Sequence, residues 1–217
     1  MKVVKESSDA LNPPVVTRAT IEPAPRRRTW RDYAALSLAT CGVGYMPVAP
    51  GTWGSALGVA IFLLFEMFGE AVFPRPASGG RNIGSIDAIN TALFSVEKST
   101  LLRTSVLVAL SIGITLVGVW ASTRAESLLR RKDPGVVVID EVAGQLLAFL
   151  FVPARAPWWI IALSFVAFRL FDIWKPYPIR RLESLESGLG IMADDVLAGA
   201  YAATLVLFVL TLIYLLP

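Results

Sequence analysis

The chain contains no histidine, and Cys41 is its only cysteine. The absence of imidazole excludes histidine phosphatases, hydrolases with a Ser-His-Asp triad and zinc sites with histidine ligands. A single cysteine cannot form an internal disulfide, so nothing in the sequence indicates an oxidising compartment. Cys41 also lacks the Cys-x5-Arg pattern of a cysteine nucleophile, because position 47 is Pro47. These absences leave carboxylates and cations as the reactive groups to consider.

Charge is scarce and apolar runs are long. Charged residues make up 17% of the chain, hydrophobic residues 55%, and the mean hydropathy is +0.62, above the usual values for a soluble domain. Thr104 to Ser122 and Val196 to Pro217 carry no charge at all. Each is close to the ~20 residues that a helix needs to cross a bilayer. A third candidate, Ser55 to Phe73, is interrupted by Glu66 and Glu70.

These runs predict an all-α polytopic integral membrane bundle with four to five membrane-embedded helices. Val142–Val152 and Trp158–Phe168 are each too short to cross alone, and Pro153 and Pro157 separate them. That hairpin either spans the bilayer or re-enters it, and the sequence leaves both open. The expected membrane segments are 55–73, 104–122, a bent hairpin at 142–168, and 196–216.

The distribution of charge predicts the orientation. With a cytoplasmic N-terminus, most of the 20 lysines and arginines fall on the cytoplasmic side, as the positive-inside rule requires. We interpret Arg26-Arg27-Arg28 as a patch facing anionic lipid, and we expect no nucleic-acid partner. Residues 1–33 are predicted to form a disordered basic tail, and 34–217 one membrane-embedded domain. Residues 74–103 are expected to form a polar loop on the far side.

A glycine- and proline-rich segment, Gly42 to Ser55, precedes the first expected span. Its composition predicts an irregular loop rather than a helix. Backbone N–H groups of such a loop, at Gly51 and Thr52, could bind an anion. An ordinary turn before the span is the simpler interpretation, and the sequence does not decide between the two.

Two pairs of acids stand among apolar or small residues, Asp140-Glu141 and Asp194-Asp195. Aspartate is a preferred N-cap residue, so Asp140 could cap the following helix, but capping accounts for only one carboxylate of a pair. Asp140 and Asp195 are each followed four residues later by a glycine. Because glycine lets a neighbouring backbone approach closely, two such helix starts could pack together and bring their acids face to face.

The segment Phe168 to Arg180 places cations and a carboxylate in an apolar run. Arg169 and Asp172 are three residues apart and share one helix face, where a simple ion pair would also explain them. Lys175 precedes a proline, which disfavours the helical conformation, so its side chain could swing into a cleft. Charges in such a place are costly, and we therefore expect a function for them.

Five carboxylates at one membrane edge would repel each other, and a hard divalent cation would remove the conflict. All-oxygen ligands favour Mg²⁺, with Mn²⁺ as the next candidate, over zinc. The neighbouring cations suit a phosphate. The predicted metal site comprises Asp140, Glu141, Asp172, Asp194 and Asp195. The predicted phosphate-binding residues are Arg169, Lys175, Arg180, Gly51 and Thr52. We expect Lys175 and the five acids to be catalytic, in phosphoryl chemistry on a lipid.

Four blocks carry a family resemblance from about residue 34 to the C-terminus: Pro50–Ser55, Asp140–Gln145, Phe168–Arg180, and Gly188–Asp195 with Ala198-Gly199. In them the chain resembles the phosphatidylglycerophosphatase A family. The resemblance implies Mg²⁺-dependent hydrolysis of phosphatidylglycerol phosphate to phosphatidylglycerol and inorganic phosphate. It also implies a multi-pass protein of the bacterial inner membrane. The orientation predicted from the charge distribution puts the five acids, and so the active site, on the cytoplasmic side. The tail and the 74–103 loop are longer than the family pattern, and 181–187 is about one residue shorter.

Two other functions fit part of the pattern. One is another membrane enzyme of lipid phosphoryl transfer, although the Asp-Gly spacing of transferases that make lipid-linked phosphodiesters is missing. The other is an ion-coupled transporter, for which two similar halves are usual and only the Asp-x3-Gly echo is present. The sequence leaves open the number of metals, the oligomeric state and the range of phosphomonoesters accepted.

Overall fold

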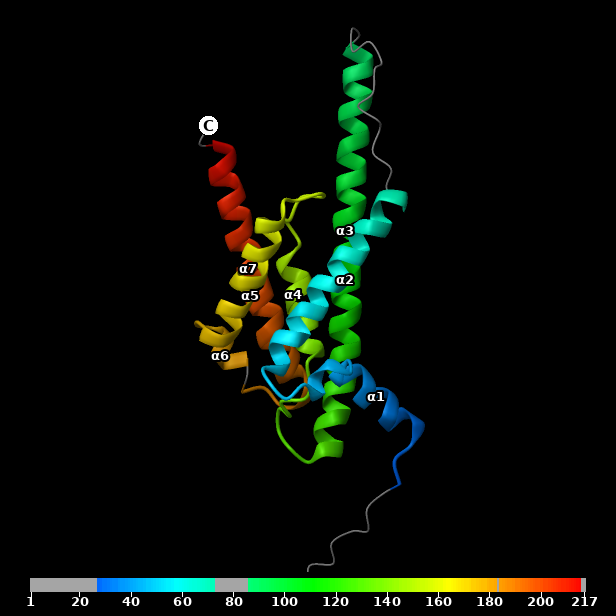
Figure 1. The fold of residues 1–217 in the computed structure, drawn as a ribbon, viewed down its shortest axis with the longest axis vertical. Helices are drawn as coiled ribbons and strands as arrows, with labels where there is room; N and C mark the ends of the chain where they lie inside the picture. The colour runs from blue at the N-terminus through cyan, green and yellow to red at the C-terminus, as the bar shows by residue number, and fades with distance from the viewer. Residues whose placement is uncertain (1–26, 73–85, 183, 216–217) are drawn as a thin grey trace, which may run out of the picture.

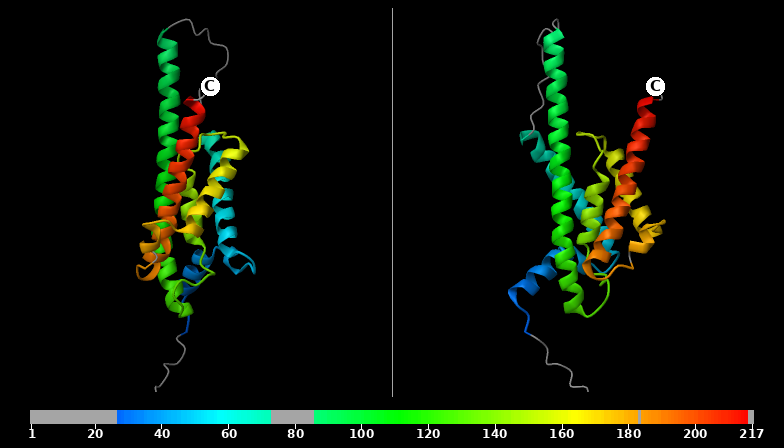
Figure 2. Two further views of the ribbon diagram at one scale, coloured as in Figure 1. Left: turned by 90° about the vertical axis from the view of Figure 1, so that its left-hand side faces the viewer. Right: turned by 180° about the vertical axis from the view of Figure 1, so that it is seen from behind.

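The computed structural model describes residues 27–72, 86–182 and 184–215, and these are helical, with no strand among them. The long helices lie side by side, and α4 is enclosed between α2, α3 and α7 (Figures 1 and 2). The helices of these residues are α1 (Trp30–Thr40), a short 3-10 turn (Val43–Tyr45), α2 (Pro50–Val72), α3 (Ile86–Leu129), α4 (Ile139–Ala148), α5 (Trp158–Trp174), α6 (Ile179–Leu182) and α7 (Ser187–Leu215).

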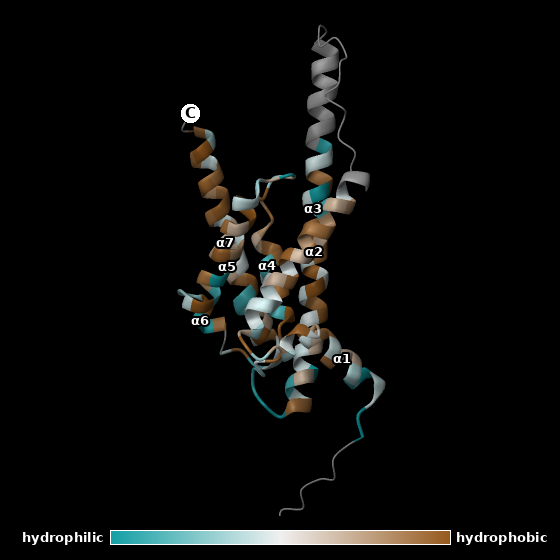
Figure 3. Cartoon of the chain, in the orientation of Figure 1, coloured by the Kyte–Doolittle hydropathy of each residue, from teal (hydrophilic) through white to brown (hydrophobic). Residues whose placement is uncertain are grey.

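Within the described residues, three helices are long and apolar enough to cross a membrane: Pro50–Gly69 of α2, Lys98–Leu129 of α3, and Ser187–Leu215. Their outer faces expose large apolar side chains, and hydrophobic colour covers them in Figure 3. Leu116 and Phe208, for example, are 67% and 59% exposed, which suits contact with lipid. The predicted all-α membrane bundle is confirmed.

The hairpin left open by the sequence consists of two unequal helices. Helix α4 has 10 residues, about 15 Å, and cannot cross a hydrocarbon core of about 30 Å. Helix α5 has 17 residues, about 25 Å, and falls just short of that thickness. Exposed tryptophans mark both of its ends, Trp158 and Trp159 at one and Trp174 at the other. Tryptophan at that position is typical of a membrane–water interface.

The core forms around α4, which is buried along most of its length. Val142 and Leu146 pack with Phe62 of α2, Leu107 of α3 and Val206 of α7. Phe62 also stacks on Phe149, just beyond the end of α4, with ring centroids 4.2 Å apart. Because three long helices pack against this short one, its first turn is held in a fixed position at one end of the bundle.

Helix α1 is anchored to this core by contacts with α3 and with the start of α4. Asp32 accepts a 2.7 Å hydrogen bond from the Thr29 backbone N–H and lies 2.6 Å from Arg124 of α3. The Thr29 hydrogen bond, with help from Arg124, lowers the pKa of Asp32 to about 2. At the other end of α1, the Ala39 carbonyl accepts a 2.8 Å bond from the Val138 N–H, at the start of α4.

Three expectations about irregular segments are wrong in part. The segment 42–55 becomes helical at Pro50, because proline is well tolerated at the first helical position. The expected 74–103 loop is helical from Ile86, after its last glycine and proline; residues 74–85 lie outside the described residues. The expected tail 1–33 is helical from Trp30, and its residues 1–26 also lie outside the description.

Candidate active site

Helices α4 and α7 meet at two glycines. A β-carbon on Gly199 would meet the carbonyl group of Gly144, and one on Gly144 would meet the carbonyl oxygen of Asp195. The two backbones are therefore in direct contact, which glycine alone permits. The predicted packing of the two Asp-x3-Gly helix starts is confirmed.

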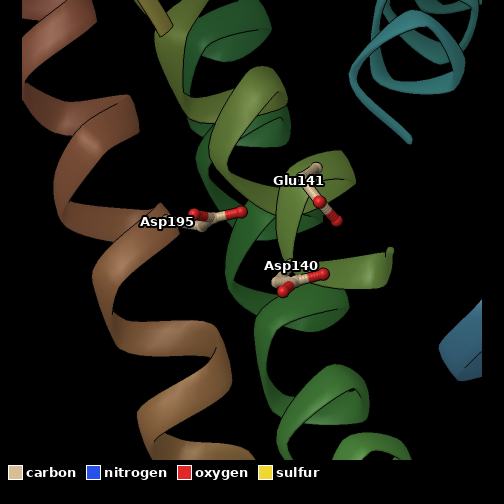
Figure 4. Close-up of side chains that lie close together, drawn as sticks. All are labelled: Asp140, Glu141 and Asp195. Atoms are coloured by element: carbon tan, nitrogen blue, oxygen red, sulfur yellow. The ribbon is translucent and has the colours of Figure 1, made fainter. Parts of the chain in front are cut away.

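This contact gathers three carboxylates. Asp140, Glu141 and Asp195 each offer an oxygen, and these oxygens all lie within 4.8 Å of one another. Figure 4 shows Asp195 of α7 reaching toward the start of α4, where the other two lie. Asp140 and Asp195 are only 8% and 3% exposed. We call these three residues the acid cluster.

The acid cluster fits a metal ion. Among the described residues, Asp140 Oδ1 and Glu141 Oε2 are buried without a hydrogen-bond partner. Such orphaned acceptors are costly unless a cation or water meets them. Burial, and then the neighbouring Glu141 charge, raises the pKa of Asp140 well above its usual range. Three oxygen ligands with no sulfur or nitrogen suit a hard cation.

Asp172 and Asp194 stand beside the acid cluster and pair with cations. Arg169 Nη1 lies 2.6 Å from Asp172 Oδ2, and Lys175 Nζ lies 2.6 Å from Asp194 Oδ2. Lys175 has left-handed backbone angles (φ 47°) as the residue that ends α5 before Pro176. As predicted, Lys175 lies outside the regular helix, and its side chain contacts Asp194 of α7. The role of all five acids as metal ligands stays a prediction.

One cavity of about 780 Å³ contains these groups. Its lining includes Glu126 near the end of α3 and Ser187 at the start of α7, and these two helix ends lie at the same end of the bundle (Figure 1). Of the predicted site residues, those that line it are Gly51, Asp140, Glu141, Arg169, Asp172, Lys175, Arg180, Asp194 and Asp195. Thr52 is missing from the lining within the described part of the chain; its N–H donates to the Ala49 carbonyl at 2.9 Å, and its side chain is exposed.

A glycine stripe on α2 lies against α4. A β-carbon on Gly51 would meet the Glu141 carboxylate, and one on Gly58 would lie 2.8 Å from Gln145 Cβ. A β-carbon on Gly54 would lie 2.9 Å from Val138 Cβ. Gly51 and Gly54, predicted to lie in a loop, therefore form one helix face with Gly58, and this face lets α2 lie directly on α4.

Sequence reasoning missed several residues at the site. Glu126, Lys132 and Asp133 line the cavity from the end of α3 and the link to α4. The polar run Arg130 to Asp133, shortly before the apolar start of α4, was the available signal. Gln145 is fully buried, and neither polar atom of its amide has a hydrogen-bond partner in the described residues. Its position one turn beyond Glu141 was the available signal.

Comparisons with known proteins identify the family of the chain. The family model described as Phosphatidylglycerophosphatase A matches residues 37–210. The chain belongs to the phosphatidylglycerophosphatase A family. It is therefore a phosphatase, and the suspected resemblance is confirmed.

Two relatives carry the family name. The Phosphatidylglycerophosphatase A of Haemophilus influenzae is 33% identical over 167 residues, 76% of this chain and 81% of that protein. The one from Escherichia coli is 27% identical over 169 residues, covering 77% and 78%. A protein of Bacteroides thetaiotaomicron, named "Putative phosphatidylinositol-3-phosphatase", is 33% identical over 166 residues, covering 76% and 86%. No solved structure matches the chain.

Proposed function

We propose that this chain hydrolyses the terminal phosphomonoester of phosphatidylglycerol phosphate, giving phosphatidylglycerol and inorganic phosphate, with Mg²⁺ bound at the acid cluster. The observation that carries the proposal is one cavity that holds the three carboxylates of the acid cluster together with four cations, Lys132, Arg169, Lys175 and Arg180, at the end of an apolar bundle. The family, and the names of two relatives, supply the substrate.

The cations bind the phosphate. Arg169 pairs with Asp172 and Lys175 pairs with Asp194. A guanidinium and an ammonium each carry several N–H donors, which suit the oxygens of a phosphate. Arg180 lines the same cavity from α6. The two ion pairs hold Arg169 and Lys175 in place before substrate arrives, so these donors need no reorganisation as negative charge develops.

The acid cluster would hold the metal, and one of its carboxylates accepts a proton from the attacking water. Mg²⁺ bound there would neutralise phosphate charge and make water more acidic. Glu141 and Asp140 each carry a buried oxygen without a partner in the described residues, and one of them accepts the proton of the attacking water. The water oxygen bonds to phosphorus, the bond from phosphorus to the glycerol oxygen breaks, and that oxygen takes up the proton that the carboxylate accepted from the water. No histidine is present to act as base.

We place the cavity on the cytoplasmic side of a bacterial inner membrane. Lys132, Lys175 and Arg180 line the cavity, and the cations at the end of α3 lie at the same end of the bundle. Positive residues concentrate on the cytoplasmic side of membrane proteins. Residues 34–217 then act as one membrane-embedded domain.

A phosphate-release assay tests the function. Full-length protein in detergent is mixed with phosphatidylglycerol phosphate and Mg²⁺, and we expect release of phosphate that stops when a chelator removes the metal. Phosphatidylinositol 3-phosphate is assayed in parallel, because the Bacteroides relative is named for that substrate. Turnover unaffected by chelation would overturn the metal assignment. Release from neither lipid would favour the transferase or transporter alternatives.

A further inference from the structure

Exposed cations lie on the surface at one end of the bundle, and one of them, Lys132, also lines the cavity. They come from two segments far apart in sequence, the start of α1 and the turn that follows α3, and all are exposed. Figure 3 shows hydrophilic colour at both segments, at the same end of the bundle. We call this surface the basic collar; its described residues are Arg27, Arg28, Arg31, Arg130, Arg131 and Lys132.

Aromatic side chains accompany the basic collar on α1. Trp30 and Tyr33 are 75% and 57% exposed, although tertiary packing buries the opposite face of the same helix. The guanidinium carbon of Arg31 lies 5.6 Å from the centroid of the Trp30 ring. Exposed tryptophan and tyrosine beside arginine are typical of the headgroup layer of a membrane, where an apolar ring and a charge are both accommodated.

The position of α1 relative to the bilayer follows from its contacts. Its Asp32 pairs with Arg124, which lies two residues beyond the uncharged stretch Thr104 to Ser122 of α3. Leu36 and Ala39 pack on Ala121 and Ala125 of that same region. Because the uncharged stretch marks the hydrocarbon core, α1 is held at the level of the headgroups.

We propose that the basic collar is a docking surface for anionic phospholipid headgroups. Six exposed cations at headgroup level complement the charge of such lipids, and each contributes to attraction toward an anionic membrane. Exposed Trp30 and Tyr33 favour a lipid surface over a nucleic acid, whose backbone would need cations alone. Lys132 belongs both to the basic collar and to the cavity lining, so bound lipids lie beside the mouth of the cavity. This docking is independent of whether the cavity hydrolyses phosphate.

Fluorescence of Trp30 tests the docking. Full-length protein is placed in nanodiscs of phosphatidylcholine and phosphatidylglycerol in which one or the other lipid is brominated. The difference between the wild type and Trp30→Phe isolates the Trp30 emission. We expect brominated phosphatidylglycerol to quench it about fivefold more effectively per lipid than brominated phosphatidylcholine, and high salt to remove the preference.

Substitutions of arginine pairs test which cations cause the preference for phosphatidylglycerol. Arg27→Ala with Arg28→Ala should bring the two quenching efficiencies to equality, and Arg130→Ala with Arg131→Ala should reduce the difference. Arg155→Ala, an exposed arginine in the α4–α5 link at the other end of the bundle, is the matched control and should change nothing. Equal quenching by both lipids in the wild type would overturn the proposal. The proposal would also be overturned if neither brominated lipid quenched Trp30, or if added RNA abolished the preference for phosphatidylglycerol.

Discussion

Gly199 of α7 lies directly on the carbonyl group of Gly144 of α4, with no space for a β-carbon between them. The carbonyl oxygen of Asp195 meets Gly144 in the same way from the other direction. The distance between the two halves of the acid cluster therefore depends on one backbone contact, because Asp140 and Glu141 begin α4 and Asp195 belongs to α7.

Gly199→Ala should separate these helices. The added methyl group costs about 1–3 kcal/mol of overpacking and moves Asp195 away from α4. Since a displacement of about 1 Å can cost about 100-fold in rate, we expect a loss of that order in kcat. Gly113→Ala is the matched control, because a β-carbon there meets nothing within 4 Å among the described residues. Equal effects of both substitutions on phosphate release would contradict the argument.

Asp195→Asn should abolish turnover by removing one ligand charge, while the protein stays in the membrane. Electron paramagnetic resonance of Mn²⁺ measures the metal directly, and we expect binding at least about tenfold weaker. Glu126→Gln, a carboxylate that lines the cavity outside the acid cluster, should leave Mn²⁺ affinity nearly unchanged. Wild-type Mn²⁺ affinity in Asp195→Asn would show that the acid cluster is no metal site.

Adjacent arginines provide a test of the phosphate site. Arg180 lines the cavity, whereas Arg181 covers the Tyr177 ring at 4.9 Å and donates a 3.2 Å hydrogen bond to its hydroxyl. Loss of a charge-assisted hydrogen bond to phosphate should lower kcat/KM of Arg180→Ala about tenfold or more, mainly through KM. Arg181→Ala should change kcat/KM less than about twofold. The reverse ranking would exclude Arg180 from substrate binding.

The hydrogen bond from the Thr29 backbone N–H to Asp32, together with the ion pair of Asp32 with Arg124, predicts a pH-dependent contribution to stability. The folded-state pKa of Asp32 is about 2, below its usual value of 3.8. Its contribution is therefore fully present above about pH 4 and is lost as the pH falls through about 2. Asp32→Asn should lower the Tm at neutral pH, and the Tm difference from wild type should narrow across that acidic range. Glu186→Gln, at an exposed position, is the control for the loss of one negative charge. A Tm difference between Asp32→Asn and wild type that stays constant with pH would contradict the role of the Asp32 carboxylate.

Hydropathy and local chemistry predicted much of this architecture. Uncharged runs identify α3 and α7, because no water-exposed helix would be apolar for that length. The repeated Asp-x3-Gly spacing predicts the contact of α4 with α7, and the proline after Lys175 predicts where α5 ends. Each of these signals lies within a few residues of the feature that it specifies.

Features that depend on contacts between residues far apart in the chain could not be predicted from the sequence. Asp32 is part of the anchored helix α1 because Arg124, 92 residues away, pairs with it. The glycines from Gly51 to Gly58 form a helix because α4 packs on them, which composition alone does not reveal. Asp172 and Asp194 appear equivalent to the other acids in the sequence, yet each is paired with a cation beside the acid cluster.

Helix α5 has a consequence for the lipid around it. Its 17 residues span about 25 Å between exposed tryptophans, against about 30 Å for ordinary hydrocarbon. If α5 lies across the bilayer, local thinning of the lipid is one way to accommodate this shorter hydrophobic segment. Thinning draws headgroups inward at Trp174 and Lys175, the end of α5 that borders the cavity. With such thinning, a phospholipid beside α5 would stand closer to the carboxylates of the acid cluster before it binds.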